Sequence, residues 1–364
     1  MSTDHDRLRI AVLFGGRSAE HEVSVRSAAN VMAALDASRY DPVPVFVTKS
    51  GRWLLSRWQA KRLETPDTGT ELCLVPGGRG QALSISEGGT AGPLPAIDVV
   101  FPVLHGLPGE DGAVQGLCEV AMVPLAGCGI LGSATALDKD VAKRLLAAAG
   151  IPVARAVTIR AEARPAFAAV EAAIGLPIFV KPARQGSSVG VAKVRTKAEF
   201  DAALDEAFRH DRVALAEEFV AGREIELAVL EAPDGSLFVS RPGEIVPAKS
   251  HGFYSYDAKY VDADGAALIV PAELDGAIEE ALQDLAERAF RALGCDGMAR
   301  VDFFVTSDGR MLVNELNTIP GFTDISMYSK VMAASGVSYP EVIDRLVAHG
   351  LKRAGVESPL FAGI

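Results

Sequence analysis

The chain has 364 residues, of which 49% are hydrophobic and 23% charged, a composition typical of a folded globular protein and not of a disordered one. This length allows two or three domains, each with its own hydrophobic core. The formal net charge of −11 leaves no surplus of cations to neutralise phosphates, which argues against a nucleic-acid-binding protein but leaves room for a local basic pocket.

The first segment of the chain predicts a parallel α/β unit. An apolar, strand-like run at residues 8–14 is followed by two glycines, a helical pattern that extends to residue 35, and a second apolar strand at 42–47. Residues 64–95 are rich in Gly, Pro, Thr and Ser and predict a loop or hairpin insert, to which we assign no role. The apolar run 97–104 predicts a buried parallel strand that ends at the polar sequence HGLPGEDG, a position where ligands tend to bind.

The rest of the chain predicts two further α/β segments. A helix is expected at residues 138–149, because Gly150 and Pro152 provide a stop signal. Further strands are predicted at residues 178–182, 189–194, 214–220 and 224–230, helices at 199–208 and 274–293, and a β-hairpin at 299–317. With soft boundaries near residues 130 and 217, the expected domains are 1–130, 131–217 and 218–364.

Cysteine usage and hydropathy predict a cytoplasmic protein with no membrane partner. The four cysteines (Cys73, Cys118, Cys128 and Cys295) form no Cys-x-x-Cys pair and have no histidines at zinc spacing, which favours buried thiols over a metal site. The apolar run near the first residue is too short for a signal sequence. No stretch reaches the ~18 uninterrupted apolar residues of a membrane span.

The strongest signal for chemistry is the sequence ARVDFFVTSDGRMLVNELN. Two alternating apolar runs flank Asp308-Gly309, the preferred pair for a two-residue type I′ turn. That turn places Asp302 opposite Glu315 and Arg300 opposite Asn317. Because side chains alternate along a strand, all four are expected on one face of the hairpin.

Facing carboxylates at Asp302 and Glu315 would repel each other, and a bound divalent cation removes that repulsion. Oxygen ligands without sulfur or imidazole suit Mg²⁺. For an arbitrary hairpin, a solvated face, or a bulge that separates the two carboxylates, is the commoner explanation. The polar, turn-rich loop TIPGFTDISMY that follows the hairpin favours a functional site.

The segment PIFVKPARQGSSVGVAKV predicts a strand, a Gly/Ser-rich turn and another strand. It matches neither a Walker A loop nor a dinucleotide motif. Its backbone N–H groups and hydroxyls could still cover phosphates, and Lys181 could reach them as a point charge. An ordinary turn with an exposed lysine explains this segment equally well. By themselves, Lys139, Glu217 and Glu224 are weak signals that solvated charges would explain.

Eight segments, in order, closely resemble the D-alanine:D-alanine ligases: LFGGRSAEHEVS, VLHGLPGEDGAVQG, LDKDVAKRLL, FVKPARQGSSVGVAKV, EEFVAGREIELAVL, FYSYDAKY, ARVDFFV and NELNTIPGFTDISMY. The resemblance spans nearly the whole chain. It implies an ATP-grasp fold of three α/β domains, with a parallel-sheet N-terminal domain and ATP between the other two. It also implies that two D-alanines are joined through a D-alanyl phosphate for peptidoglycan synthesis, by a homodimer.

The resemblance further implies which residues bind metal and nucleotide. Two Mg²⁺ ions, for which Mn²⁺ can substitute, would be held by Asp302, Glu315 and Asn317. The residues implied to bind ATP are Lys139, Lys181, Ser188, Glu217 and Glu224. In that set the lysines contact phosphates, the serine belongs to a loop that closes over them, and the glutamates lie at the adenine and ribose.

The first D-alanine is implied to bind near the beginning of the chain. Glu20 is similar to the acid that orients its ammonium group, and His105 is implied to lie beside it. Tyr260 resembles a lid residue that hydrogen-bonds to Ser187, and Ser187 in turn to Glu20.

The second half-reaction is implied to use residues of the last domain. Arg300 and the N–H of Gly321 resemble the pair that stabilises the oxyanion of the tetrahedral intermediate. Ser326, with Lys259, would bind the carboxylate of the second D-alanine. Met327 follows Ser326 at a position where relatives vary, and we expect it to influence substrate affinity.

Three alternatives remain open. A D-alanine:D-lactate ligase has the same fold and first half-reaction, but YDAKY argues against it. A ligase for other amino acids is disfavoured by Glu20 and the Ser326 loop. A catalytically silent ATP-binding regulator is disfavoured because the metal ligands, the phosphate-binding lysines and Arg300 are all present.

Overall fold

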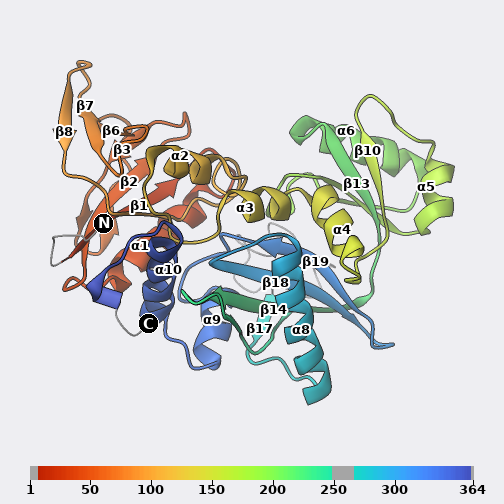
Figure 1. Ribbon diagram of the computed structural model, residues 1–364. Helices are drawn as coiled ribbons and strands as arrows, with labels where there is room; N and C mark the ends of the chain where they lie inside the picture. The colour runs from red at the N-terminus through yellow and green to blue at the C-terminus, as the bar shows by residue number, and fades with distance from the viewer. Residues whose placement is uncertain (1–6, 248–265, 362–364) are drawn as a thin grey trace.

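The computed structural model describes residues 7–247 and 266–361 and contains three main β-sheets with helices packed against them (Figure 1). Each sheet is built from a continuous piece of the chain. The first sheet has the strand order β8-β7-β6-β3-β2-β1-β9, the second β10-β13-β11-β12, and the third β17-β16-β14-β18-β19 with β15 paired to β14.

The N-terminal sheet is mixed. Its elements are β1 (Leu8–Gly15), α1 (His21–Ala34), β2 (Tyr40–Val47), β3 (Trp53–Leu55), β6 (Glu71–Leu74), β7 (Ala82–Ile85), β8 (Ala91–Leu94) and β9 (Val99–Pro102), with a small separate pair β4 (Trp58–Gln59) and β5 (Arg62–Leu63). The expected parallel pairing is confirmed for β2-β1-β9. The strands beyond β2 are antiparallel, and the 64–95 insert forms the β6-β7-β8 extension.

Three helices connect this sheet to the rest of the chain: α2 (Ala113–Ala121), α3 (Ile130–Leu137) and α4 (Lys139–Ala148). The Asp138 side chain caps α4 by accepting from the N–H groups of Asp140 and Val141, and Gly150 follows the helix with a φ of 70°. The apolar faces of α3 and α4 pack in the core of the third sheet, not in that of the second. The division at residue 130 therefore remains a prediction.

The second sheet is antiparallel throughout and carries two helices. Its elements are β10 (Ala156–Arg160), α5 (Phe167–Ile174), β11 (Ile178–Pro182), β12 (Ala192–Val194), α6 (Lys197–His210) and β13 (Val213–Glu218). A capping box between Thr196 and Glu199 begins α6. The strand β12 begins later than predicted, because Gly190, within the predicted strand, has a φ of 70°, which is incompatible with a strand.

The third sheet has helices on both faces. Its elements are β14 (Gly222–Glu231), β15 (Leu237–Val239), β16 (Gly243–Pro247), β17 (Ala266–Ile269), α8 (Gly276–Ala292), β18 (Met298–Thr306), β19 (Met311–Asn317), α9 (Met327–Ala334), α10 (Tyr339–Arg353) and the short helix η1 (Pro359–Phe361). On β14, Ile225 and Leu227 point into the core with α8, whereas Ala228 belongs to the core with α9 and α10. Side chains an even number of residues from Ala228 along β14, such as Glu226, therefore lie on the face of the sheet opposite α8.

Within the described ranges, none of the helices combines the length and the apolar character needed to span a bilayer. All four cysteines are free thiols, and Cys118, Cys128 and Cys295 are buried, as expected.

Candidate active site

The β18–β19 hairpin brings together the side chains predicted for the metal site. Asp302 lies opposite Glu315, and Arg300 lies opposite Asn317, which confirms the predicted pairing. Val301, between Arg300 and Asp302, points into the core with α8. The four polar side chains therefore share the opposite face of the sheet.

The turn of this hairpin is not the predicted two-residue turn. The Gly309 N–H donates to Thr306 O (3.0 Å), the Thr306 N–H donates to Arg310 O (2.9 Å), and Gly309 has a φ of 84°. This is a three-residue loop with a left-handed glycine. A register shift between Asp302 and Phe303 then moves the pairing by one residue in the opposite sense. The two differences cancel, and the predicted pairing at the site survives a wrong prediction of the turn.

Arg300 is held by carboxylates from two strands. Its Nε and Nη2 donate to the two oxygens of Asp302, each at 2.7 Å, and its Nε also lies 3.0 Å from Glu226 Oε2 on β14. Burial opposes the charge, but Asp302 and Glu226 together hold the pKa of Arg300 well above its ordinary value. Sequence reasoning missed Glu226, which lies opposite Asp302 only because β14 pairs with β18.

The residues predicted to bind metal fit a hard cation. Asn317 Nδ2 donates to Asp302 Oδ2 (3.1 Å), and Lys139 Nζ lies 3.4 Å from Glu315 Oε2, so the facing carboxylates are offset by a donor and a cation. An all-oxygen set of two carboxylates and one amide suits Mg²⁺ once the amide oxygen of Asn317 turns toward the ion. Among the described residues, no three His, Cys, Asp or Glu side chains form a metal-binding group. Substrate oxygens would have to complete the coordination.

Several lysines and one buried glutamate lie next to this hairpin, at the predicted phosphate site. Lys139, at the start of α4, donates to Gln185 O at 2.8 Å. Lys181 Nζ lies 2.7 Å from Glu217 Oε2, and Lys143 Nζ lies 3.2 Å from Glu217 Oε1. Lys143 was missed although it follows Lys139 by four residues, a spacing that puts both on one face of a helix.

Glu217 is a buried carboxylate between two lysines. Burial raises its pKa, but the charges of Lys143 and Lys181 outweigh this effect and hold the pKa of Glu217 below its ordinary value. Burial lowers the pKa of Lys143, which has one carboxylate partner and Lys181 as a like charge nearby. Glu217 is thus an ionised acceptor of the kind that an exocyclic amino group requires.

A cavity of about 660 Å³ lies between the second and third sheets. Its walls include seven of the residues predicted to contact ATP or metal, Lys139, Lys181, Ser188, Glu217, Glu224, Asp302 and Glu315, together with Ser187. Apolar side chains, among them Phe179 and Ile245, line other parts of the wall. A large cavity with an apolar part and a charged end is suited to a nucleotide.

The residues predicted around the first D-alanine also meet. Ser187 Oγ donates to Glu20 Oε1, the contact expected from the resemblance. His105 Nδ1 lies 2.9 Å from Ile319 O, and because a carbonyl only accepts, Nδ1 carries the proton. His105 Nε2 lies 3.2 Å from Ser27 Oγ. Burial lowers the pKa of His105, which keeps it neutral.

A third missed residue, Glu110, holds two loops of this region together. Its carboxyl accepts from the N–H of Gly106 (2.6 Å) and from the N–H of Ile319 (3.2 Å). Burial, followed by the charge of Glu20, raises the pKa of Glu110 to about 8. It lies within the HGLPGEDG motif, so the signal was in the sequence, but its partners were not.

The loop after β19 places Gly321 next to Ser326. A Cβ on Gly321 would lie 3.1 Å from Ser326 Oγ, so this backbone approaches the hydroxyl closely. Ser326 Oγ also accepts from the Thr323 N–H at 3.1 Å. Met327 does not face a binding site, because it is buried in the core against Gly243. The lid residues Lys259 and Tyr260 lie outside the described residues.

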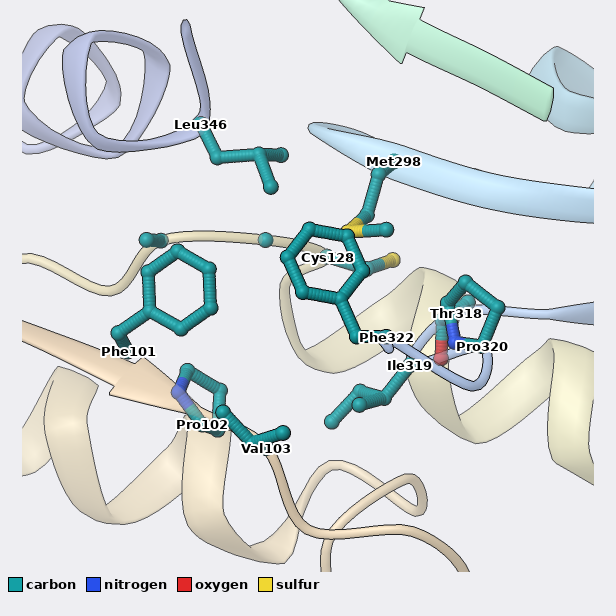
Figure 2. A pocket seen from close by; sticks show the side chains of 12 residues that line it. Phe101, Pro102, Val103, Cys128, Met298, Thr318, Ile319, Pro320, Phe322 and Leu346 are labelled. Atoms are coloured by element: carbon teal, nitrogen blue, oxygen red, sulfur yellow. The ribbon is translucent and has the colours of Figure 1, made fainter. Parts of the chain in front are cut away.

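The loop that carries Gly321 packs against apolar side chains of the N-terminal sheet. Figure 2 shows Ile319 and Phe322 of the loop facing Phe101 and Val103 at the end of β9, with Leu346 of α10 nearby. The enclosed space is only about 20 Å³, room for a single water-sized molecule. Close packing there fixes the backbone that carries Gly321.

Comparisons with known proteins identify the family to which the chain belongs. Family models described as the N-terminus and the C-terminus of D-ala D-ala ligase match residues 9–128 and 145–348. The chain is 65% identical to a D-alanine–D-alanine ligase A of Brucella suis (95% of this chain, 98% of the relative). It is 54% identical to the corresponding enzyme of Mesorhizobium japonicum (96% and 98%).

Solved structures give the same result. A D-alanine–D-alanine ligase from Coxiella burnetii aligns with a TM-score of 0.83 at 34% identity, covering 96% of each chain. The VanG D-Ala:D-Ser ligase from Enterococcus faecalis aligns with a TM-score of 0.81 at 37% identity, covering 94% of this chain and 99% of that one. The ATP-grasp fold inferred from the sequence is confirmed, and the chain belongs to the D-alanine–D-alanine ligase family.

Proposed function

We propose that the protein joins two D-alanines to D-alanyl-D-alanine for peptidoglycan synthesis, with cleavage of ATP to ADP and phosphate. The observation that carries this proposal is the position of Asp302 and Glu315 at the charged end of a cavity of about 660 Å³ that Lys139 and Lys181 also line. The names of the relatives at 65% and 54% identity support D-alanine as both donor and acceptor.

Nucleotide binding would use the charges already described. Glu217 and Glu224 would accept hydrogen bonds from the adenine and ribose, while Lys139 and Lys181 would contact phosphates beneath the loop of Ser187 and Ser188. Two Mg²⁺ ions, or Mn²⁺ in their place, would be held by Asp302, Glu315 and Asn317. When bound, they would neutralise the charge that develops on the transferred phosphoryl group.

The chemistry would run in two steps. A carboxylate oxygen of the first D-alanine, oriented by Glu20 beside His105, attacks the γ-phosphorus, and the bond to the β–γ bridging oxygen breaks to release ADP. The deprotonated amine of the second D-alanine, bound by Ser326, then attacks the acyl carbon. Arg300 and the Gly321 N–H stabilise the resulting oxyanion before the carbon–oxygen bond to phosphate breaks.

The direct test supplies D-alanine, L-alanine, D-serine and D-lactate separately as acceptors, with ATP and Mg²⁺, and follows phosphate release and product mass. We expect efficient release with D-alanine alone. Efficient turnover of L-alanine, or no turnover with D-alanine, would overturn the proposal. In mixtures with D-alanine, a dominant ester product would instead identify a depsipeptide ligase.

We also propose that the protein is cytoplasmic, since its substrate ATP is found in the cytoplasm. We further propose that it is a homodimer. Exposed apolar side chains lie on the contacting helices α2 and α3 and at the end of α2: Leu117, Val120, Met122, Ile130 and Leu131. Such a patch is typical of an interaction surface. A Leu131→Glu substitution should lower the molar mass in solution toward 38.2 kDa, measured by light scattering. An unchanged dimer would exclude this patch as the interface.

A further inference from the structure

The face of the third sheet opposite α8 carries a row of three carboxylates. Asp302 on β18 pairs with Glu226 on β14 on one side and with Glu315 on β19 on the other. Glu226 and Asp302 are both buried, with exposed fractions of 6% and 8%. Neighbouring buried carboxylates repel each other, so the row requires cations on both sides.

Two cations neutralise different members of the row. Lys139 lies beside Glu315, 3.4 Å from Oε2. Arg300 lies between Asp302 and Glu226, with its Nε 2.7 Å from one and 3.0 Å from the other. In the ligand-free arrangement, Asp302 is therefore the principal partner of Arg300.

Asp302 cannot remain the principal partner of Arg300 when a divalent cation is bound. The proposed function gives its oxygens to a divalent cation, and a carboxylate that coordinates a cation is a weaker acceptor for a guanidinium. Arg300 is buried, and a buried charge without a partner is strongly destabilised. Glu226 lies on the side of Arg300 away from Glu315, and it is the neighbouring carboxylate to which no metal role is assigned.

We infer that Glu226 is a positioning residue that holds the Arg300 guanidinium in place for the oxyanion of the second half-reaction while Asp302 serves the metal. The inference rests on the proposed function of Arg300 and deepens it. A carboxylate at Nε leaves the two terminal nitrogens of the guanidinium available to a substrate oxygen. The charge of Glu226 also offsets the repulsion between Arg300 and nearby cations.

The test separates the two half-reactions in Glu226→Gln, Glu226→Asp and Arg300→Lys. Formation of the acyl phosphate is followed by positional isotope exchange in ATP labelled at the β–γ bridging oxygen, in the presence of D-alanine. Complete ligation is followed by product formation, and ATP affinity by equilibrium binding. Glu279→Gln serves as the matched control, because Glu279 forms an exposed ion pair with Arg241 in the same part of the chain.

We expect Glu226→Gln to ligate about 10- to 100-fold more slowly, while isotope exchange and ATP affinity change less than about threefold. Glu226→Asp, which keeps the charge, should recover part of the ligation rate. The melting temperature of the ligand-free protein should also fall in Glu226→Gln, because Arg300 loses one of its two counterions, and it should be unchanged in Glu279→Gln.

The possible failures are distinguishable. Glu226→Gln that ligates at the wild-type rate, or that loses exchange in parallel with ligation, overturns the inference. If Glu226→Gln does not fold, the same comparison is made with Glu226→Ala, and ligation equal to wild type, or a parallel loss of isotope exchange and ligation, then overturns the inference. If Arg300→Lys loses exchange as severely as ligation, the role of Arg300 in the proposed function is wrong instead.

Discussion

Lys143 provides a sharp test of how the nucleotide end of the cavity works. It is buried on α4, its Nζ lies 3.2 Å from Glu217 Oε1, and it does not line the cavity. The other partner of Glu217 is Lys181, one of the two lysines proposed to contact the ATP phosphates. When Lys181 is drawn to phosphate, Lys143 has to neutralise Glu217 by itself.

The magnitude follows from the geometry. At 3.2 Å and an effective dielectric constant of about 20, the Coulomb attraction between Lys143 and Glu217 is about 5 kcal/mol. The desolvation of both charges opposes it, and a net contribution of about 1.5–3 kcal/mol remains. In Lys143→Met, Glu217 retains Lys181 and resists its transfer to phosphate. The affinity for ATP should therefore fall about 10- to 100-fold, with kcat at saturating ATP nearly unchanged.

The assay is the equilibrium binding of ATP by calorimetry, together with KM for ATP in the ligation reaction. Arg144→Met is the matched control, because Arg144 lies next to Lys143 on α4 but pairs with the Asp140 carboxylate at the surface. In the double variant with Glu217→Gln, the loss from Lys143→Met should become smaller, since no buried carboxylate remains to be neutralised. Wild-type ATP affinity in Lys143→Met, or a loss confined to kcat, would refute this reasoning.

Asp302→Asn should lower turnover about 100-fold or more and also destabilise the ligand-free protein, because buried Arg300 loses a bidentate partner; a higher melting temperature would contradict this. The hairpin by itself suggested relief of repulsion instead. Arg300→Ala should lower kcat far more than ATP affinity, measured by turnover and calorimetry. The pKa of Glu110 rises from 4.5 to about 8 on folding, so the native protein retains a proton that the unfolded chain loses, and stability should fall as pH rises from 4.5 to 8. Glu110→Gln should flatten this slope in melting curves, and an equal slope would exclude Glu110 as its source. Tyr260→Phe should keep dipeptide synthesis at reduced efficiency and gain relative use of D-lactate, most clearly below neutral pH in a competition assay; an unchanged product ratio would limit Tyr260 to closing the site.

Much of the site followed from local patterns. Alternation along residues 299–317 predicted a hairpin, and it placed Arg300, Asp302, Glu315 and Asn317 on one face, as the structure confirms. Motif resemblance predicted the Ser187–Glu20 contact across the site. The details of the turn were wrong, because an Asp-Gly pair is compatible with both two- and three-residue loops. A bulge further along the strand restored the pairing.

The charged residues that support the site residues were not predicted. Glu226 meets Arg300 through the pairing of β14 with β18, Lys143 meets Glu217 between α4 and β13, and Glu110 joins loops that follow β9 and β19. Lys143 had a local signal in its helical spacing from Lys139, and Glu110 lay within the HGLPGEDG motif, but their partners could not be read from the sequence.

What the sequence by itself determined is therefore the local structure and the set of reactive side chains. Hydrogen bonding along a strand or helix imposes a period that is visible in neighbouring residues. Which charge neutralises which was decided only by the tertiary structure. A buried charge is stable only beside a partner, and distant segments such as Glu226 and Arg300 become neighbours only when the sheets assemble.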